Sequence, residues 1–264
     1  MDTLKTAIER AKRIKGPAGF LYVKDEGTGE TPIVFLHSFG GSSAHWKAQS
    51  EHLRENHRVI SFDFRAHGRS DSPDDNDYSA ESLAADLAAV VDNLKLANFV
   101  LVGHSMGGAA AIAYAGKNPQ KISGLVLTGT PGKTSPEQSK PIIASLESDA
   151  YEKVMEDYTN QLLTNAKPEV DSAVRTGIKK LSKETTLDII KAMFQFDPLP
   201  ALNRYKGPTL IIATSRENKQ STALHHQVPG VEKKIIDGTS HWIQMDKPEE
   251  FNGLLDDFLR AVEK

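Results

Sequence analysis

The chain has 264 residues, no cysteine, and 32 lysine and arginine residues against 35 aspartate and glutamate residues, which gives a formal net charge of −3. This length allows one α/β domain with a sizeable insertion. The charge balance leaves no basic surface for nucleic acid, and the lack of cysteine excludes disulfides, thiolate nucleophiles and thiolate metal sites.

Residues 1–15 alternate charged and apolar side chains and contain no apolar core of a secretory signal. No stretch of the chain approaches the roughly 20 consecutive apolar residues that span a bilayer. We therefore expect a cytoplasmic protein that binds neither nucleic acid nor a membrane.

The first expected element is an amphipathic helix over residues 3–14, which Gly16-Pro17 would end. Its apolar residues recur at helical spacing: Leu4, Ala7, Ile8, Ala11 and Ile14. Farther along, short apolar runs predict buried strands, and amphipathic stretches predict helices. The strands are expected at 20–24, 33–36, 59–62, 99–102, 122–127, 208–213 and 234–236, and the helices at 43–55, 79–96, 106–117, 221–227 and 248–262. Strands that alternate with helices predict a mostly parallel sheet with helices on both faces.

Residues 132–200 interrupt this alternation, because they contain no strand-like run. Ser135-Pro136 and Lys167-Pro168 are typical helix starts, and Ser182 is a typical cap for a further helix. We expect three or four helices here. Most of their apolar side chains should hold these helices together, and a minority should line a ligand pocket; the candidates are Ile142, Ile143, Leu146, Tyr151, Met155, Tyr158, Leu162, Met193, Phe194 and Phe196.

The most informative motif is Gly103-His104-Ser105-Met106-Gly107, which lies between a predicted strand and a predicted helix. G-x-S-x-G in this setting is typical of a nucleophile elbow, a sharp turn that exposes the serine hydroxyl above a sheet. The glycines are needed because the turn crowds the backbone against its neighbours. The N–H groups that begin the following helix would face a negative charge developing on a substrate bound at Ser105.

The loops after other predicted strands also contain recognisable motifs. His37-Ser38-Phe39-Gly40-Gly41 resembles the H-G-x-x-G loop of α/β-hydrolases, with Ser38 where glycine is usual. The segment from Asp63 to Ser70 is similar to that family's D-x-R-G-x-G-x-S turn, and Gly238-Thr239-Ser240-His241-Trp242 is similar to its histidine loop. The resemblance is to serine-nucleophile α/β-hydrolases and covers roughly residues 20–131 and 198–262. It implies an α/β-hydrolase core over 1–131 and 198–264, with a helical cap over 132–197.

The resemblance also implies the roles of individual residues. Ser105 would be the nucleophile, His241 its base, and Glu217 the acid that orients the base, at a position where the family usually has aspartate. The loop after the strand at 122–127 offers no carboxylate, and Asp237 is too close to His241 in sequence to be the first choice. Backbone N–H groups of Phe39 and Met106 would form the oxyanion hole, with Ser38 narrowing or polarising the acyl side of the pocket.

The remaining histidines are expected to have structural roles. His37 should brace the oxyanion loop, and Asp63, Arg65 and His67 should form a hydrogen-bonded turn beside the site. His225 and His226 should have a surface or packing role. No H-x-x-x-H or H-E-x-x-H spacing is present, so we expect neither a metal nor a cofactor.

The resulting hypothesis is a serine hydrolase that cleaves carboxylic esters of small or medium apolar substrates through an acyl-enzyme. The same residues could serve other chemistry of this fold: C–C bond hydrolysis, acyl transfer, perhydrolysis or cyanohydrin cleavage. A third possibility is a small-molecule receptor that keeps the same residues without rapid turnover. The sequence leaves these alternatives open.

Overall fold

The computed structural model describes residues 10–263 and contains an eight-stranded sheet in the order β1-β2-β4-β3-β5-β6-β7-β8. β1 and β2 are antiparallel to their neighbours, and the other strands are parallel. This confirms the predicted mostly parallel sheet. The strands are β1 (Arg10–Gly16), β2 (Gly19–Glu26), β3 (Ile33–Leu36), β4 (Val59–Phe62), β5 (Phe99–His104), β6 (Ile122–Thr128), β7 (Thr209–Ala213) and β8 (Glu232–Ile235).

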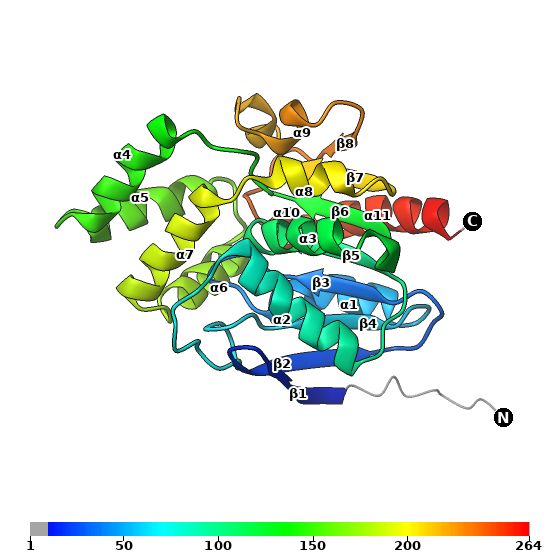
Figure 1. The fold of residues 1–264 in the computed structure, drawn as a ribbon. Helices are drawn as coiled ribbons and strands as arrows, with labels where there is room; N and C mark the ends of the chain where they lie inside the picture. Colours follow the sequence, from blue (N-terminus) through cyan, green and yellow to red (C-terminus); the bar gives the residue numbers. More distant parts are fainter. Residues whose placement is uncertain (1–9, 264) are drawn as a thin grey trace.

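Helices cover both faces of the sheet (Figure 1). Alternate side chains of one strand pack on opposite faces, so Val34 and Leu36 join one apolar cluster while Ile33 and Phe35 join the other. The first cluster includes α2 (Ala80–Asn93), α3 (Met106–Lys117) and α8 (Pro198–Arg204), and the second includes α1 (Lys47–Leu53), α10 (Ile243–Asp246) and α11 (Pro248–Val262). The remaining short helical turns of the described residues are η1 (Ser43–Trp46), η2 (Pro119–Lys121), η3 (Glu217–Lys219) and α9 (Leu224–Gln227).

The amphipathic helix predicted over 3–14 is wrong where the structure describes it. Residues 10–16 form β1, which pairs with β2 in a hairpin that places Ile14 opposite Leu21. Successive side chains of the strand point to opposite faces, so Ile14 is buried while its neighbours Arg13 and Lys15 are exposed. On the edge strand, Lys12 forms an ion pair with Asp25 of β2 at 2.8 Å. Pairing with β2 therefore decided between a helix and a strand, which the apolar pattern of such a short segment cannot distinguish. The rest of the prediction lies outside the described residues.

Four helices lie between β6 and α8, within the predicted three or four: α4 (Pro136–Glu147), α5 (Tyr151–Leu162), α6 (Pro168–Ile178) and α7 (Lys183–Gln195). Ser135 forms a capping box with Gln138, and the Ser182 hydroxyl accepts a hydrogen bond from Thr185 N, so two of the predicted starts carry their caps. The four helices gather at one end of the sheet (Figure 1). We call residues 132–197 the cap.

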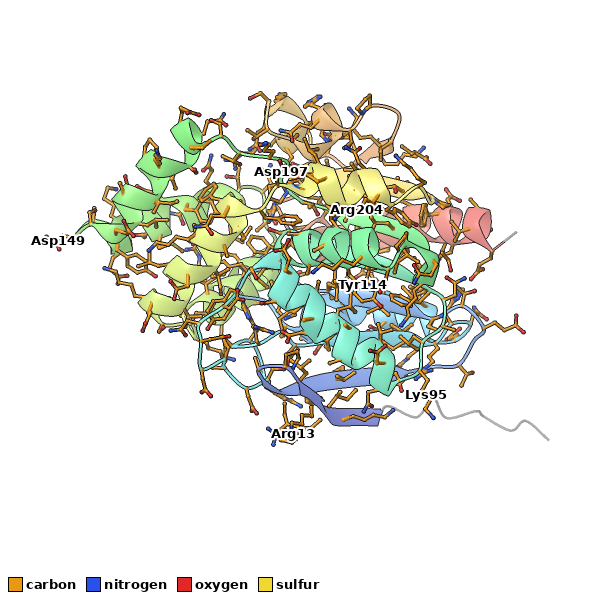
Figure 2. All side chains as sticks on the ribbon, in the orientation of Figure 1. Arg13, Lys95, Tyr114, Asp149, Asp197 and Arg204 are labelled. Atoms are coloured by element: carbon orange, nitrogen blue, oxygen red, sulfur yellow. The ribbon has the colours of Figure 1, made fainter. Side chains whose placement is uncertain are left out.

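The cap leads back to the core through α8, which lies along α3. Figure 2 shows Asp197 and Arg204 at the two ends of α8, and Asp149 far from them at the tip of the cap. The Arg204 guanidinium donates to Gly116 O of α3 at 3.1 Å. Within residues 10–263, no helix has the length and apolar character needed to cross a membrane.

Candidate active site

Ser105 occupies a strained turn between β5 and α3, with φ 53° and ψ −113°. A non-glycine residue rarely adopts a positive φ, and such strain is often found at functional positions. The turn is held by Ser105 N, which donates to Thr128 O of β6 at 2.9 Å. A Cβ on Gly107 would lie 2.5 Å from Leu36 O, so only glycine fits at the start of α3. The turn therefore has the geometry that the motif predicts.

His241 and Glu217 form a close pair after β8 and β7. His241 Nδ1 lies 2.6 Å from Glu217 Oε1, while Glu217 Oε2 accepts a hydrogen bond from Thr214 N at 3.0 Å. Burial alone would raise the pKa of Glu217, but the hydrogen bonds and charge of His241 and the hydrogen bonds of Thr214 hold that pKa below its ordinary value. Glu217 is therefore a carboxylate at neutral pH and orients the imidazole.

Ser105, His241 and Glu217 line one cavity of about 240 Å³. The described side chains show no hydrogen bond between the Ser105 hydroxyl and the His241 ring. The ring nevertheless lies close to the Ser105 turn. Thr128 O accepts the hydrogen bond from Ser105 N, and a Cβ on the next residue, Gly129, would lie 2.6 Å from His241 Cε1. Catalytic hydrogen bonds are often long before substrate binds, so this geometry is compatible with a nucleophile and its base.

The loop after β3 forms a tight turn that leaves one backbone donor free. Gly41 N donates to Ser38 O at 3.0 Å, and Gly40 has a φ of 66°, which closes the turn around Phe39. Among the described hydrogen bonds, none is donated by Phe39 N or by Met106 N, the first residue of α3. Unpaired buried N–H groups are rare, so this pair is a candidate anion-binding site.

Phe39 and Met106 do not line the 240 Å³ cavity. Their loops nevertheless touch, because a Cβ on Gly107 would lie 2.6 Å from His37 O. Phe39 follows β3 on one side of Ser105, and the cavity extends over the ends of β6 and β7 on the other. The Phe39 donor and the cavity therefore lie on opposite sides of Ser105.

Two buried histidines support the turn that contains Phe39. His37 Nδ1 donates to Ser38 O at 2.8 Å while its Nε2 accepts from Phe64 N, which matches the predicted bracing role. His67 Nε2 accepts from Gly40 N at 3.2 Å and its Nδ1 donates to Arg65 O. Burial lowers the pKa of both rings, and His67 lowers that of His37 further. Both rings are thus neutral and can accept these bonds.

The neighbouring charged residues Asp63 and Arg65 are held by hydrogen bonds and ion pairs and do not line the cavity. Asp63 Oδ1 accepts from Ser43 N at 2.7 Å and its Oδ2 accepts from Arg69 N at 2.9 Å. Arg65 pairs with buried Asp86 at 2.7 Å. The expected structural role of Asp63, Arg65 and His67 agrees with these contacts.

The cap forms one wall of the cavity. Of the ten apolar cap residues that the sequence singled out, the cavity is lined by a minority, as expected: Tyr158, Leu162, Met193 and Phe194. The core wall includes Thr130, Pro131 and the end of β7. His225 also lines the cavity, a position that sequence reasoning missed because nothing in its local pattern separates a cavity wall from a surface.

Ser38 has an unexpected contact. Its side chain is 1% exposed and is absent from the cavity wall, so it does not narrow or polarise the pocket as the sequence suggested. The Ser38 Oγ instead accepts a hydrogen bond from Trp242 Nε1 at 3.1 Å. The departure from the usual glycine was the only sequence signal for this contact.

The described residues contain no group of three histidine, cysteine, aspartate or glutamate side chains that could hold a metal ion.

A profile of the alpha/beta hydrolase fold matches residues 31–172, more than half of the chain. The chain belongs to this family. It is 27% identical to a putative 2-succinyl-6-hydroxy-2,4-cyclohexadiene-1-carboxylate synthase of Bacillus subtilis (strain 168), over 91% of this chain and 94% of that protein. It is 28% identical to an sn-1-specific diacylglycerol lipase of Mus musculus, over 86% of this chain and 80% of that protein.

Among solved structures, a thermophilic esterase from Thermogutta terrifontis matches this α/β hydrolase with a TM-score of 0.81 and 25% identity. The match covers 97% of this chain and all of that esterase. These relatives are named as a putative synthase, a lipase and an esterase, so family membership leaves the particular reaction open.

Proposed function

We propose that this α/β hydrolase cleaves carboxylic esters of small or medium apolar substrates through an acyl-enzyme. The observation that carries the proposal is the shared cavity, into which the strained turn of Ser105 and the 2.6 Å His241–Glu217 pair both open. A serine hydroxyl is a weak nucleophile at neutral pH and needs a neighbouring base.

In the proposed mechanism, the Ser105 Oγ attacks the ester carbonyl while His241 Nε2 takes its proton. The Glu217 carboxylate keeps the proton of the ring on Nδ1 and stabilises the imidazolium. His241 then protonates the departing alcohol, and in the second half it activates the water that releases the acid. The N–H groups of Phe39 and Met106 would bind the oxyanion, and each such donor typically stabilises the transition state by about 3–4 kcal/mol.

The cavity supports the choice of substrate. Its volume of about 240 Å³ lies below the roughly 300–1,000 Å³ of drug-sized sites, which favours short acyl or alcohol groups. Tyr158, Leu162, Met193 and Phe194 give it an apolar wall. The lipase and the esterase among the relatives act on esters by name. We propose a small-molecule ester as the partner and the cytoplasm as the location.

The decisive experiment compares the wild-type enzyme with Ser105→Ala on p-nitrophenyl acetate, butyrate and octanoate. We expect turnover of the short esters by the wild type, its loss in the variant, and covalent labelling of Ser105 by a fluorophosphonate, detected by mass spectrometry. Retained turnover in Ser105→Ala would remove the mechanism. Binding of esters or lactones that raises Tm without turnover would instead favour a receptor.

A further inference from the structure

A buried hydrogen bond joins the loop after β3 to the loop after β8. Trp242 Nε1 donates to Ser38 Oγ at 3.1 Å, between residues that are 204 positions apart in sequence. Ser38 is 1% exposed and Trp242 is 2% exposed, so water does not compete for this bond. Loss of the acceptor would leave a buried donor without a partner, which destabilises the fold.

At its Ser38 end, the bond joins the turn that contains Phe39. Ser38 O accepts from Gly41 N at 3.0 Å and from His37 Nδ1 at 2.8 Å, so both its main chain and its side chain are held. Phe39 is the next residue, and its free N–H has the orientation that this turn dictates. A shift of Ser38 would therefore move the proposed oxyanion donor.

At its Trp242 end, the bond joins the loop that contains the proposed base, His241. Trp242 follows His241, and the two rings lie nearly perpendicular with their centroids 5.3 Å apart. Trp242 N donates to Ser240 Oγ at 3.1 Å, and Ser240 N donates to buried Asp246 at 2.8 Å. These bonds fix the backbone on both sides of His241, so the indole has little freedom to move independently of the imidazole.

We propose that Ser38 is a positioning residue whose hydroxyl, through Trp242, sets the place of the Phe39 N–H relative to the His241 ring. Oxyanion donor and base must act on the same carbonyl group, and nothing in the local sequence of either loop determines their separation. The family pattern has glycine where Ser38 stands, and glycine offers no acceptor for the indole. This inference rests on the proposed ester hydrolysis.

The test uses Ser38→Ala, Trp242→Phe and the double variant, with Ser61→Ala as a matched control. Ser61 is also a serine with 1% exposure, but it lies in β4 and its hydroxyl has no hydrogen-bond partner. For each protein we would measure kcat and KM on p-nitrophenyl butyrate, the free energy of unfolding in urea, and inhibition by an alkyl boronic acid, which mimics the tetrahedral intermediate.

We expect Ser38→Ala to lower kcat by about 10- to 100-fold, the range that small misplacements of catalytic groups produce. KM and inhibition by the product acid should change little, while the boronic acid inhibition constant should rise in parallel with the loss of kcat. In the double variant the unpaired indole donor is gone, so the two substitutions together should destabilise the fold by less than the sum of their separate effects. The value of kcat should stay low, because the bond between the loops is still missing.

A value of kcat within twofold of wild type in Ser38→Ala would overturn the proposal. So would a kcat that follows stability across the three variants, because Ser38 would then act only on folding. Failure of the proposed function has a different signature: wild-type turnover or boronic acid binding that does not depend on Ser105.

Discussion

The two sides of Ser105 differ in how they are built. On the side of β3, His37 donates a hydrogen bond to the turn around Phe39, and His67 and Asp63 accept hydrogen bonds from Gly40 N and Ser43 N. Phe39 and Ser38 in this turn are buried. On the side of β7, the Glu217–His241 pair borders a cavity that the cap closes only in part.

The rigid β3 side and the hollow β7 side suit two different tasks of the proposed mechanism. The proposed oxyanion donor must keep its position, and on the β3 side the two neutral rings and Asp63 hold its turn through hydrogen bonds. A substrate must enter and leave, so the β7 side is hollow and has apolar walls. Changes on the β7 side should therefore affect catalysis with little effect on stability, whereas changes on the β3 side should affect stability as well as catalysis.

The largest effect is expected on the β7 side from Glu217→Gln. An amide could donate to His241 Nδ1 and favour the wrong tautomer, so kcat should fall about 10³- to 10⁴-fold. Stability should change far less. The measurement is kcat for a short ester beside unfolding in urea, with Glu232→Gln on exposed β8 as the control. A near-wild-type kcat would move the acid to another residue.

On the β3 side, acid should destabilise the fold before it protonates the carboxylates. Burial, with a smaller effect from His67, lowers the pKa of His45 from 6.5 to about 4. The unfolded chain then binds more protons below pH 6.5, so stability is complete above that pH and falls as pH drops toward 4. His45 alone would cost about 3 kcal/mol at pH 4.

Urea unfolding between pH 7 and 4.5 measures this loss, and His45→Gln should reduce it. The rest should persist, because burial also lowers the pKa of His37 and His67. The lowered pKa of Glu217 gives stability that is lost only below its ordinary value of 4.5, so it does not contribute in this window. A free energy of unfolding that stays constant from pH 6.5 to 5 would contradict the prediction.

On the β3 side, His67→Ala should lower both stability and kcat. Gly40 N loses its acceptor, and a buried unpaired donor costs about 1–3 kcal/mol. We expect lower stability together with a moderate fall in kcat, because the Phe39 turn loosens. His226→Ala, which removes an exposed ring, serves as the control. Unchanged unfolding and unchanged kcat in His67→Ala would show that the turn does not depend on this ring.

The smallest effect is expected from filling the cavity with Met193→Trp. Added volume on the cap wall should exclude long acyl chains, so the ratio of kcat/KM for octanoate to that for acetate should fall about tenfold, the range for one or two methylenes in an apolar pocket. Acetate turnover should be retained. An equal loss for both esters would mean that this wall does not contact the acyl chain.

Much of this architecture could be predicted from the sequence. The strand runs, the Ser105 turn and the helices at 106–117 and 248–262 are encoded locally, because apolar periodicity and glycine sterics act over a few residues. The helix over 3–14 failed where it is described, because the strand register depends on β2. His225 and the Ser38 contact were missed because each depends on distant loops.

By itself, the sequence determined which groups stand at strand ends: a serine in a glycine-flanked turn, a glutamate after β7 and a histidine after β8. These are consequences of short-range rules for the backbone. The order of the strands in the sheet decided the rest: that Glu217 meets His241, that the Phe39 turn and the cavity lie on opposite sides of Ser105, and that Ser38 meets Trp242. Such contacts arise from packing between segments far apart in the chain, and no local pattern encodes their distances.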